Sequence, residues 1–108
     1  MAISEIEISE LIGNGAPIVD VRERDEYAAG HVPGAVNVPL SEIADRARDA
    51  CLGPVVHVIC QAGGRSMRAC EFLEGRSETS GVTFVNVAGG TGAWIASGFE
   101  VVVGDSPR

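Results

Sequence analysis

One short segment of the chain carries residue types that suit nucleophilic chemistry. Cys60 ends the longest β-branched run in the sequence. The five residues after it are Gln61, Ala62, Gly63, Gly64 and Arg65. A tight turn that contains glycine can point several backbone N–H groups inward and form a nest for an anion. A helix that begins directly after the turn adds the positive end of its dipole. The pattern predicts a loop that binds a small anion.

The thiol of Cys60 is expected to face this loop. N–H donors and nearby positive charge lower the pKa of a cysteine, so we expect the pKa of Cys60 to lie below the free value of about 8.5. A thiolate in such a nest suits a nucleophile that attacks or carries a small anionic group, and Arg65 adds a positive charge at the end of the loop. The local pattern leaves one alternative open, a small buried cysteine beside an ordinary glycine turn.

The other cysteines indicate neither disulfides nor a metal site. The chain has three, Cys51, Cys60 and Cys70, with no CxxC pair. An odd number in a chain that begins without a signal peptide argues against a disulfide framework, and zinc-ligand spacing is absent. We interpret Cys70 as core packing, since a free cysteine behaves as a small hydrophobe, with a resolving thiol for Cys60 as the alternative. Cys51 is expected toward the opposite edge of the sheet.

Length, composition and charge restrict the classes of protein. The 108 residues, 45% of them apolar, predict a single domain over residues 1–108. A net charge of −7 argues against nucleic acid and anionic membranes as partners. All eight basic residues are arginines, which excludes Schiff-base chemistry and a P-loop lysine. Because the first ten residues are polar and acidic, and no apolar run reaches the roughly 20 residues of a membrane helix, we expect a cytosolic protein.

Alternating strands and helices must position the loop. Apolar runs predict strands at residues 17–21, 36–38, 55–60 and 83–87. Periodic patterns predict helices at residues 8 to 11 or 12, 24–29, 41–50, 66 to 74 or 75, and 91–97. Unbroken apolar strands between helices are typical of a parallel α/β sheet covered on both faces. Ligands of such sheets bind beyond the carboxyl ends of the strands, which is where Cys60 stands.

Two segments carry more detailed predictions. Ser41 is expected to cap the helix over 41–50, with Glu42 and Arg46 paired one turn apart. The polar residues 75–81 are expected to form an exposed loop.

Three residues are expected to support the site. Asp20 ends a strand near it and is interpreted as a structural hydrogen-bonding residue with Arg22 as its partner. Ser66 follows the loop directly. For the two histidines, we expect His31 to make a hydrogen bond that fixes its turn, and His57 to be a satisfied core residue.

The remaining candidates have structural interpretations. Trp94 is expected to anchor the last helix in the core. Glu23, Asp25 and Glu26 are interpreted as an acidic helix start that interacts favourably with the helix dipole.

Three blocks of the sequence, taken in order, resemble the rhodanese-like sulfurtransferases. The first block lies between Asp20 and Leu40 and contains DVRE, EY, GHVPGA and NVPL. The second is the loop from Cys60 to Arg65, and the third, between Val87 and Gly98, contains VAGG and AW. Together the blocks extend over about residues 19–101, and their combination is specific to that family.

The resemblance implies a fold and a reaction. It implies a rhodanese domain, with a five-stranded parallel sheet and helices on both faces. It also implies a double displacement in which Cys60 takes a sulfane sulfur from thiosulfate or a persulfide and becomes a persulfide. Cyanide or a thiol, including a protein thiol, then removes that sulfur. The amides of Gln61 to Arg65 would hold the persulfide and the donor, and no metal or organic cofactor is implied.

Departures from the family pattern and rival functions stay open at this point. The connection over residues 75–81 is longer than is usual in the family. Because Arg65 is the only charged residue of the loop, a persulfide donor fits as well as thiosulfate. Phosphatases of this fold have one more residue between cysteine and arginine, and arsenate reduction would need a relay through Cys70. A persulfide carrier without turnover, or a redox-sensing module that binds a partner, is the further alternative.

Overall fold

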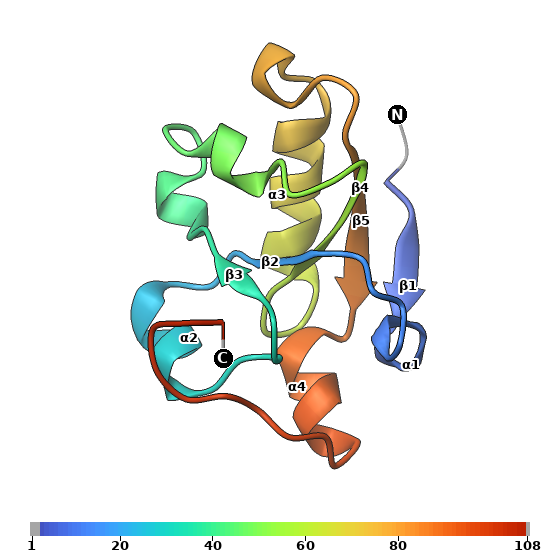
Figure 1. Cartoon of the computed structure of the whole chain (residues 1–108), viewed down its shortest axis with the longest axis vertical. Coiled ribbons are helices and arrows are strands. Elements are labelled where there is room, and N and C mark those ends of the chain that lie inside the picture. Colours follow the sequence, from blue (N-terminus) through green and yellow to red (C-terminus); the bar gives the residue numbers. More distant parts are fainter. Residues whose placement is uncertain (1–2, 108) are drawn as a thin grey trace.

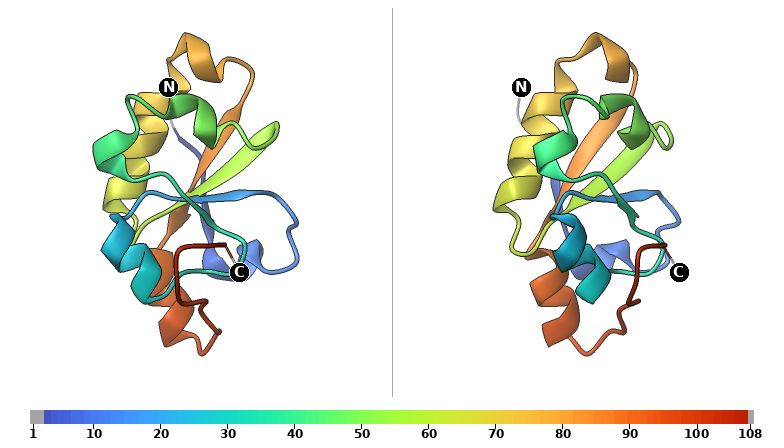
Figure 2. Two further views of the ribbon diagram at one scale, coloured as in Figure 1. Left: turned by 60° about the vertical axis from the view of Figure 1, so that its left-hand side comes forward. Right: turned by 90° about the vertical axis from the view of Figure 1, so that its left-hand side faces the viewer.

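The computed structural model describes residues 3–107 as one parallel sheet between two layers of helices (Figures 1 and 2). The strands are β1 (Glu5–Glu7), β2 (Ile18–Asp20), β3 (Val36–Asn37), β4 (Val55–Ile59) and β5 (Thr83–Ala88). They are ordered β1-β5-β4-β2-β3, and each neighbouring pair is parallel. This arrangement confirms the predicted five-stranded parallel sheet.

Helices cover both faces of the sheet, as predicted. They are α1 (Ile8–Leu11), α2 (Arg24–Ala29), α3 (Gly64–Glu74) and α4 (Gly90–Ala96). Three single 3-10 turns accompany them: η1 (Leu40–Glu42), η2 (Ala47–Ala50) and η3 (Ser77–Thr79). One core cluster joins the sheet to α3 and the segment 40–50, and a second joins it to α1, α2 and α4. Within residues 3–107, no helix has the length and apolar character to cross a membrane.

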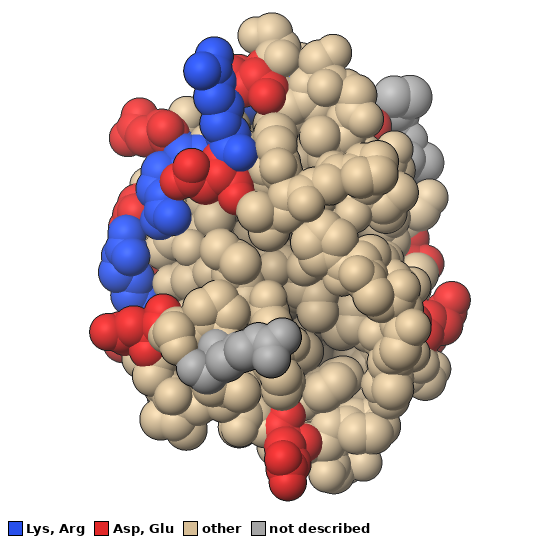
Figure 3. All heavy atoms as spheres, viewed as in Figure 1, with Lys and Arg blue, Asp and Glu red and all other residues tan. Residues whose placement is uncertain are grey.

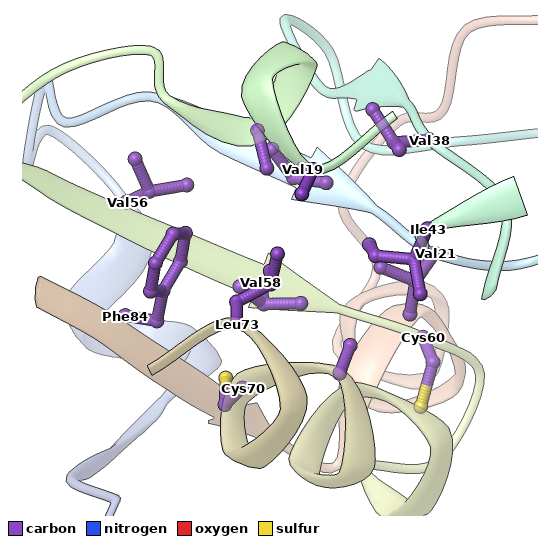
Figure 4. Close-up of a cluster of buried hydrophobic side chains, with 13 residues drawn as sticks. Val19, Val21, Val38, Ile43, Val56, Val58, Cys60, Cys70, Leu73 and Phe84 are labelled. Carbon is purple, nitrogen blue, oxygen red and sulfur yellow. The ribbon is translucent and has the colours of Figure 1, made fainter. Parts of the chain in front are cut away.

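Alternation along the strands decides which core each side chain enters. Val56 and Val58 of β4 belong to the same buried cluster as Leu73 of α3 and Phe84 of β5 (Figure 4). Ile59 belongs to the opposite cluster. Successive residues of a strand face opposite sides, so Cys60, directly after β4, lies on the same side as Val56 and Val58. Cys60 therefore faces α3.

The helix predicted over residues 41–50 is wrong. The segment forms η1 and η2, two single 3-10 turns, instead of one α-helix. The Ser41 hydroxyl donates to the Glu23 carboxylate (2.6 Å), so it does not cap a helix. The predicted Glu42–Arg46 ion pair is present at 3.2 Å. Burial of Ile43, Ala47 and Ala50 against the first core determines the path of this segment.

The edge strand β1 has no counterpart among the runs that the sequence indicated as strands. It pairs with β5 so that Glu5 lies opposite Asn86. Its residues are mostly exposed, so it lacks the apolar run by which buried strands are recognised. The strand is specified by its partner far along the chain rather than by its own sequence.

The segment 75–81 is more ordered than the exposed loop that was expected. It contains η3, and Thr79 is buried, with its hydroxyl donating to the Leu73 carbonyl. The Cys51 thiol donates to the Glu78 carbonyl (3.6 Å), which joins this segment to the chain before β4. Cys51 therefore lies at the end of β4 opposite Cys60, as predicted.

The structure confirms the prediction for His31, whereas His57 and Trp94 differ from what was expected. The ring nitrogens of His31 lie 2.8 Å from the carbonyl oxygens of Tyr27 and Ser106, which confirms its structural role. His57 is buried, but its Nδ1 has no hydrogen-bond partner among the described residues, so it is not the satisfied residue that was expected. Trp94 is only partly buried at the edge of the second core, and its indole N–H donates to the Glu100 carbonyl.

Candidate active site

The loop after β4 holds Cys60 at its base and exposes its rim. Cys60 is 1% exposed, whereas Gln61, Ala62 and Gly64 are exposed. Helix α3 begins at Gly64, two residues earlier than the sequence indicated. Gly64 and Arg65 therefore belong to the first helical turn, where backbone N–H groups have no acceptor within the helix.

Hydrogen-bond donors converge on the Cys60 sulfur. The Gly63 amide donates to Sγ (3.1 Å) and the Ser66 hydroxyl lies 3.3 Å from it. Gly63, whose N–H points at the sulfur, has φ +106°, a conformation that favours glycine. Burial raises the pKa of the Cys60 thiol, but hydrogen bonds from Ser66 and the amides of Gly63 and Ala62 outweigh it, so the pKa lies below its ordinary value. The direction is the one that the sequence predicts.

A polar chain across the sheet orients the Ser66 hydroxyl. The Asn86 amide nitrogen donates to the Glu5 carboxylate (2.7 Å) and to the Gly63 carbonyl (3.2 Å). Its oxygen must therefore face Ser66, whose hydroxyl lies within hydrogen-bonding distance of it. A hydroxyl has one proton, so Ser66 can donate to Asn86 or to a Cys60 thiolate at one time. The sequence reasoning missed Asn86 and Glu5, and the only local signal was a polar residue inside the apolar run of β5.

The amino end of α4 holds the backbone of the loop. The Thr91 amide donates to the Cys60 carbonyl (2.8 Å) and the Gly92 amide to the Gln61 carbonyl (3.0 Å). The first amides of a helix have no partner of their own, so these bonds satisfy both segments. They tie the loop to the segment after β5.

A buried ion pair supports the other side of the loop. Asp20, at the end of β2, pairs with Arg22 (2.9 Å), and the two side chains are 0% and 5% exposed. The predicted pairing of these residues is confirmed. Arg22 also donates to the Gly30 carbonyl (2.7 Å) and to the Gln61 side-chain oxygen (3.4 Å). The pair thus connects β2 and α2 to the rim of the loop.

The guanidinium of Arg65 is occupied by a carboxylate. It donates two hydrogen bonds to Glu26 of α2, at 2.7 and 2.9 Å. The hydrogen bond from Arg65 lowers the pKa of Glu26 to about 2, although burial opposes the shift. Glu26 also accepts from the Glu23 amide, as a capping box requires. The interpretation of Glu26 as a helix start was therefore incomplete, because it does not include this contact across the loop.

Comparison with known protein families shows the family of this chain. The model of the rhodanese-like domain matches residues 4–97. This chain belongs to the rhodanese-like domain family. The rhodanese-related protein from Thermoplasma volcanium has a similar structure, with a TM-score of 0.80 and 33% identity, over 93% of this chain and 98% of that one.

Two curated relatives of this rhodanese-like domain have names that refer to sulfur transfer or to a sulfur carrier. The thiosulfate sulfurtransferase GlpE of Pseudomonas entomophila is 36% identical over 74 residues, which are 68% of each chain. The "Putative sulfur carrier protein YrkF" of Bacillus subtilis is 39% identical over 57 residues. The aligned stretch is 53% of this chain but only 31% of YrkF, so the similarity covers a minor part of that protein.

Cys70 of this rhodanese-like domain is a core residue. It is 0% exposed and packs beside Leu73 and Phe84, apart from the Cys60 sulfur (Figure 4). Burial raises the pKa of its thiol to about 12, so it is protonated at neutral pH. The predicted core packing is confirmed, and a resolving thiolate at this position is disfavoured.

Replacing Gly90 by alanine is expected to displace the Cys60 loop. A Cβ at Gly90 would lie 2.3 Å from the Cys60 carbonyl oxygen and 2.7 Å from that of Gln61, and φ is +58°. Because both neighbours are backbone, we expect a loss of about 1–3 kcal/mol in the free energy of unfolding, and slower alkylation of Cys60. Denaturant unfolding and peptide mass analysis measure the two effects.

Gly75→Ala is the matched control for this prediction. Gly75 follows α3 with φ −97°, and nothing lies within 4 Å of a Cβ there. The Gly75→Ala variant should retain the wild-type alkylation rate of Cys60. Equal unfolding free energies and equal alkylation rates in the two variants would contradict the role assigned to Gly90.

Proposed function

We propose that this rhodanese-like domain is a sulfurtransferase that moves a sulfane sulfur through a Cys60 persulfide. The observation that carries the proposal is the set of donors around the Cys60 sulfur, which favours a thiolate at the base of an anion-binding loop. Family membership supports it, and so does the relative named as a thiosulfate sulfurtransferase.

The reaction takes place in two displacements at sulfur. The Cys60 thiolate attacks the outer sulfur of the donor, and a new S–S bond forms while that of the donor breaks. The electron pair leaves with sulfite when the donor is thiosulfate, or with a thiolate when it is a persulfide. Cyanide or an acceptor thiolate then attacks the terminal sulfur of the Cys60 persulfide, which restores the Cys60 thiolate. Each step balances without an added oxidant or reductant.

The loop residues bind, orient and stabilise in these steps. The amides of Gln61 to Arg65 hold the donor anion and then the persulfide. Those of Gly64 and Arg65 can do so because first-turn N–H groups of α3 have no helical acceptor. The Ser66 hydroxyl donates a hydrogen bond to the sulfur when negative charge is present there. Asp20 and Arg22 keep Gln61 in place. The Gly63 amide and the Ser66 hydroxyl stabilise the Cys60 thiolate in the resting and regenerated states.

A persulfide carrier is the second candidate, and the relative named as a sulfur carrier favours it. A carrier would accept one sulfur at Cys60 and pass it to a protein thiol with little turnover. A reductase is less well supported because Cys70 lies in the core, and a phosphatase because the loop has four residues between Cys60 and Arg65. The acceptor, and the expected cytosolic location, stay predictions.

Turnover tests the proposal directly. Thiocyanate formation from cyanide and thiosulfate should be absent in Cys60→Ala and close to wild type in Cys70→Ala, which removes a thiol that the reaction does not use. Initial rates at several fixed donor concentrations should give parallel double-reciprocal lines, since a double displacement releases sulfite before cyanide reacts. Turnover that survives in Cys60→Ala would overturn the proposal. A single sulfur transfer without turnover would replace it by the carrier.

A further inference from the structure

The charges around the loop of Cys60 cancel. Arg22 pairs with Asp20, and Arg65 pairs with Glu26. The Glu26 carboxylate is hydrogen-bonded by Arg65, which is the main cause of its lowered pKa, and the charge of Arg22 adds a smaller effect in the same direction. When Cys60 is a thiolate, the site therefore carries a net negative charge. A donor with two negative charges meets repulsion that only backbone amides offset.

Of the two pairs, the Arg65–Glu26 pair is the more exposed, so we expect its opening to cost the fold less. Its side chains are 33% and 34% exposed, whereas those of Arg22 and Asp20 are buried. Arg65 lies in the first turn of α3, close enough for the charge of Cys60 to raise its pKa, although Glu26 has the larger effect. Without Glu26, the guanidinium would be free to bind a donor beside the sulfur.

Pairing of arginines is not confined to the loop. On the face shown in Figure 3, arginine side chains lie beside carboxylates along one edge of the molecule. Arg76 and Glu78, after the far end of α3, form a pair much like that of Arg65 and Glu26, with two hydrogen bonds at 3.1 and 2.9 Å and side chains 33% and 29% exposed. This second pair offers a matched control for the first.

We propose that Glu26 determines donor specificity by withholding the Arg65 guanidinium from the site. The site then favours sulfane donors with one negative charge at the reacting group, such as persulfides and thiosulfonates, over doubly charged thiosulfate. The inference rests on the proposed sulfurtransferase function and names its class of donor. It assigns to Glu26 a role that acts through Arg65, so Glu26 is a positioning residue.

Two donors of nearly equal shape isolate the effect of charge. In the methanethiosulfonate anion, a methyl group replaces one oxyanion of thiosulfate. With either donor, the Cys60 thiolate bonds to the outer sulfur and the donor S–S bond breaks. The electron pair leaves with methanesulfinate or sulfite respectively. The two reactions thus differ by one charge at the position that Arg65 would reach.

The experiment compares kcat/KM for the two donors, with cyanide as the acceptor. Glu26→Gln removes the charge but can still accept from the Glu23 amide. We expect it to raise kcat/KM for thiosulfate by about fivefold or more, mainly through KM, because a charged hydrogen bond becomes available to the donor. The methanethiosulfonate value should change much less. Glu26→Ala should show the same selective gain, which keeps the test valid if one variant is unstable.

Two controls separate this inference from a general effect of charge. Glu78→Gln makes the same change in net charge at the matched ion pair and should leave the donor preference unchanged. Adding Arg65→Gln to Glu26→Gln should abolish the gain in kcat/KM for thiosulfate. An unchanged donor preference in both Glu26 variants would overturn the inference while wild-type turnover still supported the sulfurtransferase. Absence of turnover with either donor in the wild type would instead overturn the proposed function.

Discussion

Replacing Asp20 by alanine should destabilise the domain more than any other single change considered for this site. The variant leaves Arg22 buried, with the charge that Asp20 neutralised uncompensated. Removing one partner of a buried ion pair costs about 3–5 kcal/mol. Unfolding in urea, followed by the fluorescence of the single tryptophan Trp94, measures this loss. The loop should also loosen, because Arg22 no longer holds Gln61.

An exposed ion pair provides the matched control for Asp20. Asp49 pairs with Arg46 at 2.8 Å, but its side chain is 55% exposed. Asp49→Ala should change the free energy of unfolding by less than about 1 kcal/mol. The double variant Asp20→Leu with Arg22→Met should be less damaged than Asp20→Ala, since no buried charge remains. A loss in Asp20→Ala no larger than in Asp49→Ala would show that the buried pair does not support the fold.

Removing the Ser66 hydroxyl should raise the pKa of Cys60. That hydroxyl is the largest of the influences that lower this pKa, and burial alone would raise it. A hydrogen bond to a charged group contributes about 1.5–3 kcal/mol, and one pKa unit corresponds to about 1.4 kcal/mol. We therefore expect Ser66→Ala to raise the pKa by about one unit. Below the wild-type midpoint, the thiolate fraction and the alkylation rate should fall about tenfold.

Alkylation of Cys60 as a function of pH measures this shift. Peptide mass analysis separates Cys60 from Cys51 and Cys70, and the midpoint of the rate profile gives its pKa. Ser80→Ala, at an exposed serine after η3, is the control and should keep the wild-type midpoint. A wild-type midpoint at or above about 8.5, the free value, would contradict the thiolate account, as would an unchanged midpoint in Ser66→Ala.

Local sequence was sufficient to identify the loop and most of the elements that support it. The β-branched run of β4 and the glycines after Cys60 specify a buried strand and a tight turn within a few residues. α2 begins and ends where the sequence predicts. Asp20 and Arg22 are two positions apart, so their pairing was also open to local reasoning. Each of these features depends on residues that are close together in the chain.

The features that the sequence analysis missed depend on contacts between distant residues. Asn86 reaches Glu5 across 81 positions, and Arg65 reaches Glu26 across 39. The segment 41–50 has the composition of a helix, but the Ser41 hydroxyl binds Glu23 instead of capping one. In each case a polar group found its partner only after the sheet had brought separate elements together. Residue types alone do not specify such partners.

The mass of the intact protein tests the central claim, a persulfide on Cys60. The wild type and Cys60→Ser are incubated separately with thiosulfate and with methanethiosulfonate, then treated with cyanide. The account predicts that the wild type gains the mass of one sulfur atom from at least one donor and loses it to cyanide, while Cys60→Ser gains nothing. A sulfur gain that survives in Cys60→Ser, or no gain in the wild type with either donor, would contradict it.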